Sequence, residues 1–215
     1  MKRLTVLLTA ICLAPLMAGG ILLKDLVDSA REPALKLAPW LFGPASARWT
    51  ITEFADLECP YCKTYTPELK RWVSQQADVN LQWHHLPLPF HGPAALYQAR
   101  FVECAGVLGD ANTFWEAVDQ VLQRTRGNGQ GFDGHLDVTG IDKRDLEDCA
   151  DKNFAVAQQV EAQIQEAASK GINATPTLLV TDNSTGKSVK LEGPADGPTL
   201  LSTIDWLATQ SARSP

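Results

Sequence analysis

Two cysteines three positions apart, Cys59 and Cys62, are the residues of this sequence best suited to chemistry. They lie in the stretch FADLECPYCKTYTP, after a β-branched segment that predicts a strand, and Pro60 suits the first turn of a helix. Such a pair could bind a metal, crosslink the fold or exchange electrons. A structural zinc site needs four ligands, and no second closely spaced pair is present; a bridge across three positions would constrain the unfolded chain little. Redox chemistry is therefore the favoured interpretation.

The expected helix explains how the two cysteines would divide the work. Disulfide exchange requires a thiolate, and Cys59 should lie at the helix N-terminus, where free amide N–H groups and the helix dipole stabilise negative charge. Cys62 lies one turn further on the same side and should be more shielded, with a higher pKa. We therefore expect Cys59 to form the mixed disulfide with a substrate and Cys62 to resolve it.

Two motifs carry a family resemblance. TEFADLECPYCKTYTPELK resembles the active-site strand and helix of the thioredoxin-fold disulfide oxidoreductases of the bacterial periplasm, which are the DsbA-like proteins and the DsbC and DsbG isomerases. Pro67, which should kink the helix five residues after Cys62, is a feature shared with thioredoxins generally. GINATPTLLV resembles the cis-proline loop of the family, with Pro176 as the cis-proline and Thr175 before it. The resemblance runs from about Trp49 to the C-terminus.

The resemblance also implies roles for individual residues. Pro60 and Tyr61 would contact the substrate beside the first cysteine, and Thr175 would offer its backbone N–H and C=O groups to an extended substrate. Glu53 matches the strand carboxylate that serves the resolving thiol as a proton acceptor in the family, and a buried glutamate with a raised pKa suits that role. A water-facing edge carboxylate is the alternative for Glu53. The resemblance implies no cofactor and no metal.

The predicted elements run strand, helix, strand, a block of helices, two strands and a helix. This order indicates an α/β fold, and the resemblance implies a DsbA-like thioredoxin fold with a helical insertion at about residues 91–170. A positive start followed by an uncharged apolar run predicts a signal peptide over residues 1–18, with an uncleaved membrane anchor as the alternative. Residues 19–47 predict a helical arm, and residues 48–215 the thioredoxin-like domain.

Removal of the signal would leave four cysteines, an even number that favours two disulfides in an oxidising compartment. Cys104 and Cys149 lie on apolar faces of predicted helices in the insertion, which indicates a structural disulfide, with two buried free thiols as the alternative. His91 and His135 lie in predicted loops with no evident partner. The net charge of −6 argues against a nucleic-acid partner.

The direction of catalysis depends on two residues. Tyr61 stands where the strong oxidant of the family has a histidine, so the Cys59 thiolate should be less stabilised and the disulfide less oxidising. Thr175 before the cis-proline resembles DsbC and DsbG more than DsbA. These residues favour a periplasmic disulfide isomerase or reductase that acts on exported proteins and is reset by a membrane redox partner. Because the isomerases that it resembles are dimers held by an N-terminal domain, we expect the arm to mediate a homodimer. A monomeric DsbA-like oxidase is the alternative.

Two other classes of protein share the cysteine motif. Glutaredoxins also use CPYC, but they are short, cytosolic and lack a helical insertion. A non-catalytic copper(I)-binding module would use the same two thiolates as ligands, since copper(I) prefers soft sulfur. The export signal and the length argue against the first class, whereas metal analysis would detect the second.

Overall fold

The computed structural model describes residues 39–212. The expected signal peptide and most of the expected arm, through residue 38, lie outside the described residues. Within residues 39–212, no helix has both the length and the apolar character that crossing a membrane would require.

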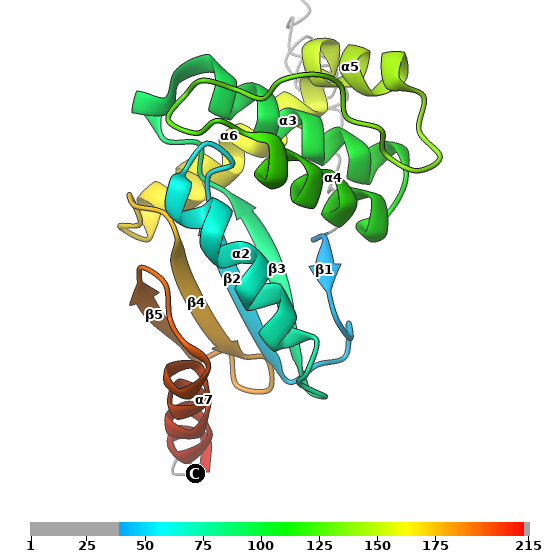
Figure 1. Cartoon of the computed structure of the whole chain (residues 1–215). Helices are drawn as coiled ribbons and strands as arrows, with labels where there is room; N and C mark the ends of the chain where they lie inside the picture. Colours follow the sequence, from blue (N-terminus) through cyan, green and yellow to red (C-terminus); the bar gives the residue numbers. More distant parts are fainter. Residues whose placement is uncertain (1–38, 213–215) are drawn as a thin grey trace, which may run out of the picture. The chain divides into compact units, whose positions relative to one another are not determined.

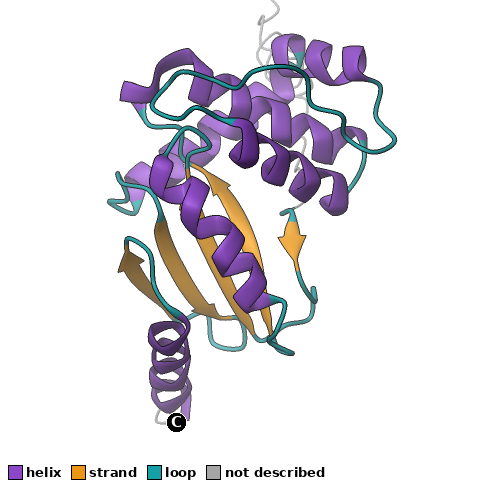
Figure 2. Ribbon diagram, viewed as in Figure 1, coloured by secondary structure: helices purple, strands orange, loops and turns teal. Residues whose placement is uncertain are grey.

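A mixed five-stranded sheet forms the centre of the fold (Figure 2). Its strands, in chain order, are β1 (Leu41–Phe42), β2 (Trp49–Ala55), β3 (Val79–His85), β4 (Thr177–Asp182) and β5 (Ser188–Glu192). In space they lie in the order β1-β3-β2-β4-β5, with β2 and β3 parallel and every other pair antiparallel. β2 is the central strand, and its carboxyl end leads directly into the CPYC segment.

The helices divide into those that cover the sheet and those of the insertion (Figure 1). They are α2 (Pro60–Val73), the 3-10 turn η1 (Pro89–His91), α3 (Gly92–Leu108), α4 (Ala111–Arg124), α5 (Lys143–Lys152), α6 (Phe154–Ser169) and α7 (Gly197–Ala212). α2 connects β2 to β3 across one face of the sheet, and α3 to α6 all lie between β3 and β4 in the chain. The predicted thioredoxin fold with an inserted helical subdomain is confirmed.

Alternation along β2 places its side chains on two separate cores. Ile51 packs in the main core with α2 and α7, and Glu53, two residues on, points the same way and meets Thr66 of α2. Phe54 points to the opposite face, where it packs with Ala167 of α6 in a smaller cluster. The period of two therefore delivers a carboxylate into the core beneath the active-site helix.

Residues 39–47, which the sequence assigned to the arm, are part of this fold. Leu41 and Phe42 pair antiparallel with β3, and the Trp40 indole Nε1 donates to Glu103 Oε1 at 3.0 Å. The boundary of the thioredoxin-like unit expected at residue 48 therefore lies further towards the N-terminus. A two-residue strand between Pro39 and Pro44 has no periodicity that sequence reasoning could detect.

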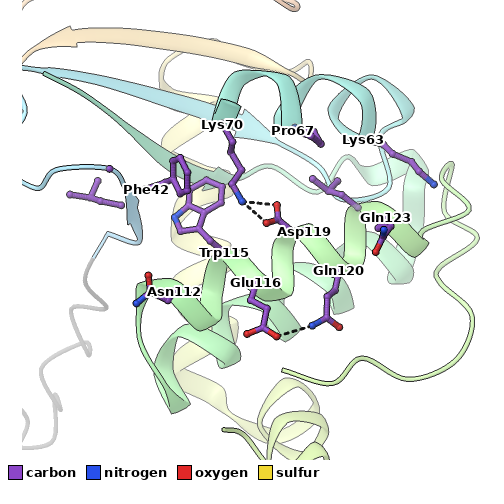
Figure 3. A pocket seen from close by; sticks show the side chains of 13 residues that line it. Phe42, Lys63, Pro67, Lys70, Asn112, Trp115, Glu116, Asp119, Gln120 and Gln123 are labelled. Atoms are coloured by element: carbon purple, nitrogen blue, oxygen red, sulfur yellow. Dashed lines mark hydrogen bonds and ion pairs between the residues drawn. The ribbon is translucent and has the colours of Figure 1, made fainter. Parts of the chain in front are cut away.

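A polar contact ties the active-site helix to the insertion (Figure 3). Lys70 Nζ of α2 lies 2.6 Å from both carboxylate oxygens of Asp119 on α4, and 5.0 Å from the ring centroids of Phe42 and Trp115. These four residues border a cavity of about 1000 Å³. None of Cys59, Cys62 and Pro176 lines that cavity, so we do not assign the chemistry to it.

Candidate active site

The two cysteines of the CPYC motif occupy the start of α2. Cys59 is the N-cap residue, with Pro60 at the first helical position, and no side chain caps the free amides of the first turn. Cys62 lies one turn further on and is completely buried, whereas Cys59 retains 4% of its surface. Both are free thiols in this structure, which therefore represents the dithiol state.

The surroundings lower the pKa of Cys59 from its ordinary value of 9.0 to about 5. The main cause is the hydrogen bond that the Cys62 thiol donates to the Cys59 sulfur, followed by Thr175 and the backbone N–H groups of Cys62 and Tyr61; burial acts in the opposite direction. Thr175 can interact with either protonation state of the sulfur. Its carbonyl oxygen lies 3.5 Å from Cys59 Sγ and accepts from the neutral thiol, while its buried hydroxyl, which has no partner among residues 39–212, is free to donate to the thiolate.

The pKa of Cys62 is shifted in the opposite direction. Burial raises its pKa well above 9.0, and its hydrogen bond to Cys59 and the nearby charge of Glu53 raise it further. One thiol of the pair is therefore ionised near neutral pH while the other holds its proton. This asymmetry suits Cys59 to react with the substrate and Cys62 to act as the shielded resolving thiol.

The predicted substrate-binding residues gather beside Cys59. Pro60, Tyr61 and Thr175 line one cavity of about 470 Å³ together with the cysteine. The Thr175–Pro176 peptide bond is cis, and Pro176 is buried. Tyr61 is 70% exposed, so its ring is available to a substrate chain.

Glu53 lies beneath this site and is completely buried. One carboxylate oxygen accepts from Thr66 Oγ1 at 2.8 Å, and the other has no partner among the described residues. Burial raises the pKa of Glu53 from 4.5 to about 8, with the Cys59 charge contributing in the same direction. The alternative of a water-facing edge carboxylate is excluded by this burial.

The sequence interpretation missed two acidic side chains between β2 and α2. The first, Asp56, accepts from the backbone N–H of Glu58 at 2.8 Å and from that of Leu88 at 2.7 Å. It also bonds His91 Nδ1 at 2.7 Å. The expectation that His91 has no partner was therefore wrong, because its partner lies 35 positions away in the chain.

Glu58, the second, is completely buried directly before the first cysteine. Its carboxylate accepts from the Gln98 side chain, from Thr125 Oγ1 at 2.6 Å and from Gly131 N at 3.1 Å, and its carbonyl accepts from Asn128 N at 2.7 Å. These bonds fix residues 125–131 against the start of α2. The only sequence signal was the presence of acidic residues where a buried strand meets the CPYC motif.

The second pair of cysteines lies in the insertion. Cys104 of α3 and Cys149 of α5 form a disulfide, with Cα atoms 5.9 Å apart and a separation of 45 positions in the sequence. The sulfurs belong to the main core, since Cys104 is fully buried and Cys149 is 9% exposed.

Comparisons with known proteins agree with this geometry. The thioredoxin family profile matches residues 37–195. The crystal structure of Pseudomonas aeruginosa DsbA2 is 57% identical, with a TM-score of 0.76 over 79% of this chain and 93% of that chain. Disulfide bond formation protein D of Bacillus subtilis is 28% identical over 162 residues, which are 70% of this chain and 71% of that protein.

A third relative is much longer than this chain. The Na(+)/H(+) antiporter NhaA 1 of Salinispora arenicola is 31% identical over 157 residues, which are 70% of this chain but 22% of the antiporter. Across the antiporter relatives the chain spans 21–25% of their length. The match over most of the chain places this chain in the thioredoxin family, and the extent of the likeness to DsbA2 places it among the DsbA-like members of that family.

Proposed function

We propose that this protein is a disulfide oxidase, which donates a Cys59–Cys62 disulfide to cysteine-containing proteins. The sequence favoured an isomerase or reductase, with the oxidase as the alternative. The likeness to DsbA2 and to a protein named for disulfide bond formation supports the oxidase instead. The observation that carries the proposal is the lowered pKa of Cys59, at about 5.

That pKa bears directly on the direction of catalysis. A thiolate that is stabilised in the reduced protein makes reduction of the enzyme disulfide more favourable, so the disulfide becomes a stronger oxidant. The sequence argument held that Tyr61, in place of a histidine, would leave the thiolate less stabilised. The Cys62 thiol and the helix amides stabilise it without a charged residue in the dipeptide.

The reaction follows from the asymmetry of the two thiols. A substrate thiolate attacks Cys59 Sγ, the Cys59–Cys62 bond breaks, and Cys62 takes the electron pair and a proton. The second substrate thiolate then attacks the substrate sulfur of the mixed disulfide, and Cys59 leaves as a stable thiolate. Glu53 exchanges the proton of Cys62 from beneath the site. Thr175 pairs with the extended substrate through its backbone, next to Pro60, Tyr61 and the cis-proline.

The setting of the reaction is also part of the proposal. The signal expected over residues 1–18 would export the chain to the periplasm, where its substrates would be exported proteins and a membrane redox partner would reoxidise the reduced enzyme. The homodimer expected through residues 19–47 stays a prediction. The mass of the exported protein in solution, with and without residues 19–38, tests it.

Equilibration with glutathione tests the oxidase proposal. We expect a reduction potential less negative than about −180 mV. We also expect rapid oxidation of reduced ribonuclease, with weak recovery of activity from scrambled ribonuclease, and Cys59→Ser as the inactive control. A potential near about −270 mV, with efficient unscrambling, would reverse the assignment in favour of the isomerase or reductase.

A further inference from the structure

A buried pair of titratable side chains, Asp56 and His91, lies next to the CPYC motif and has no part in the reaction described above. Asp56 is 1% exposed and His91 is 5% exposed, and their side chains are bonded at 2.7 Å. The bond joins the loop after β2 to the end of η1. A buried carboxylate and imidazole in contact are a recurring arrangement for moving protons.

The hydrogen bonds assign the tautomer of the ring. The Asp56 carboxylate already accepts from the backbone N–H groups of Glu58 and Leu88, and it accepts from His91 at Nδ1. Nδ1 must therefore carry a hydrogen, so the neutral ring has its lone pair at Nε2. Nε2 has no hydrogen-bond partner within residues 39–212, and it is not among the buried unpaired atoms of that range.

The ring borders the cavity into which a substrate cysteine must enter. His91 and Cys59 line the same cavity of about 470 Å³, with the exposed rings of Tyr61 and Phe90 also on its wall. The remaining lining residues are Pro60, Leu88, Asn128, Asn173, Ala174 and Thr175. The titratable groups that face the ring are therefore Asp56 behind it and, on the wall of the cavity, Cys59 and Tyr61. Asn128, Asn173, Ala174 and Thr175 add only uncharged side chains to this wall.

We propose that His91 is a catalytic residue, whose Nε2 removes the proton from the incoming substrate thiol, and that Asp56 is the positioning residue that holds the ring. The proposal rests on the oxidase function. The substrate S–H bond breaks, its proton goes to Nε2, and the sulfur keeps the electron pair with which it attacks Cys59 Sγ; the Cys59–Cys62 bond breaks and Cys62 takes the electrons. The imidazolium, stabilised by Asp56, then loses the proton to water.

The variant His91→Asn tests this proposal. The asparagine side-chain N–H can replace Nδ1–H as the donor to Asp56, whereas nothing replaces Nε2. We expect the single-turnover rate of the oxidised enzyme with an alkyl dithiol peptide to fall at least about tenfold at pH 7, where such thiols are mostly protonated. At pH 9.5 the peptide is ionised without help, so the two rates should converge. His135→Asn, on the exposed insertion loop, is the matched control and should follow the unaltered protein at both pH values.

Two results would overturn the role of His91. One is a ratio of the unaltered to the His91→Asn rate that is the same at pH 7 and pH 9.5, and the other is the absence of any difference between the two rates. Should the variant not fold, the unaltered enzyme suffices. If the substrate thiol ionises in water before it attacks, the rate at pH 7 should fall about fourfold for each unit by which the pKa of the substrate thiol rises across a series of substrates. If His91 removes the proton, we expect no such fall. An enzyme that oxidises no dithiol at either pH would contradict the oxidase function itself, which is a separate outcome.

Discussion

The two cysteine pairs of this protein are almost equally buried, and only one of them has surroundings that suit exchange. Cys59 is 4% exposed and Cys149 is 9% exposed, so access to solvent does not separate the two pairs. Cys59 is the N-cap residue of α2, next to the free amides of the first turn, whereas Cys104 and Cys149 lie inside α3 and α5, where the amides are already bonded within the helix. The position of a sulfur on its helix therefore matters more than its exposure.

We expect the largest effect on activity, where removal of a sulfur from one pair should differ most from removal of the other pair. We expect Cys59→Ser to lower the rate of oxidation of a dithiol peptide by at least about a thousandfold, because it removes the attacked sulfur. The double variant Cys104→Ala/Cys149→Ala should stay within about twofold of the unaltered rate at 25 °C, since neither sulfur touches the site. A comparable loss in both variants would show that the insertion disulfide takes part in exchange.

The insertion disulfide, which should matter little for activity, should matter for stability. The Cys104–Cys149 bond closes a loop of 45 positions, and its loss should lower the free energy of unfolding by about 2–4 kcal/mol. Denaturant unfolding of the double alanine variant and of the unaltered protein measures the difference. An equal midpoint in both would mean that α3 and α5 are held together by packing alone.

The pH dependence of stability should carry the signature of Cys59. Its folded pKa of about 5 lies below the ordinary 9.0, so the stability it contributes is present above pH 9 and is lost as the pH falls through 5. As the pH rises from 5 to 9, the folding equilibrium constant of the dithiol form should therefore increase relative to that of the disulfide form by up to about tenfold per pH unit. Unfolding of both redox forms across this range measures the gain, and a constant difference would remove the thiolate from the account.

The CPYC pair and the cis-proline could be predicted from sequence because each motif is local, within a few positions of Cys59 or Pro176. Glu53 was likewise identified by the resemblance, from its position on the strand six residues before Cys59. Asp56 and His91 could not be connected, because their bond joins segments 35 positions apart that only the β2–β3 pairing brings together. The direction of catalysis was argued from Tyr61, whereas the thiolate is stabilised by the Cys62 thiol, Thr175 and backbone amides, which the identity of residue 61 does not report.

Glu53 distinguishes the CPYC pair in a second way, because burial raises the pKa of this carboxylate beneath the two thiols. With its pKa at about 8, Glu53 becomes a proton acceptor as the pH passes that value. We expect Glu53→Gln to slow the attack of Cys62 on a preformed mixed disulfide by about tenfold above pH 8. The reaction of Cys59 with the substrate should keep its rate and serves as the internal control. Unchanged release would remove Glu53 from the mechanism.

Glu58 should give the smallest effect, through the segment that it holds against α2. Glu58→Gln would turn an amide N–H towards donors that now meet a carboxylate, namely the Gln98 side chain, the Thr125 hydroxyl and the Gly131 amide. One mismatched buried donor should cost about 1 kcal/mol of stability. Hydrogen exchange of the Asn128 and Gly131 amides should quicken, while Glu161→Gln, at an exposed site, should leave it unchanged. Since Asn128 lines the Cys59 cavity, faster exchange without a change in reaction rate would mean that the reaction does not depend on the rigidity of residues 125–131.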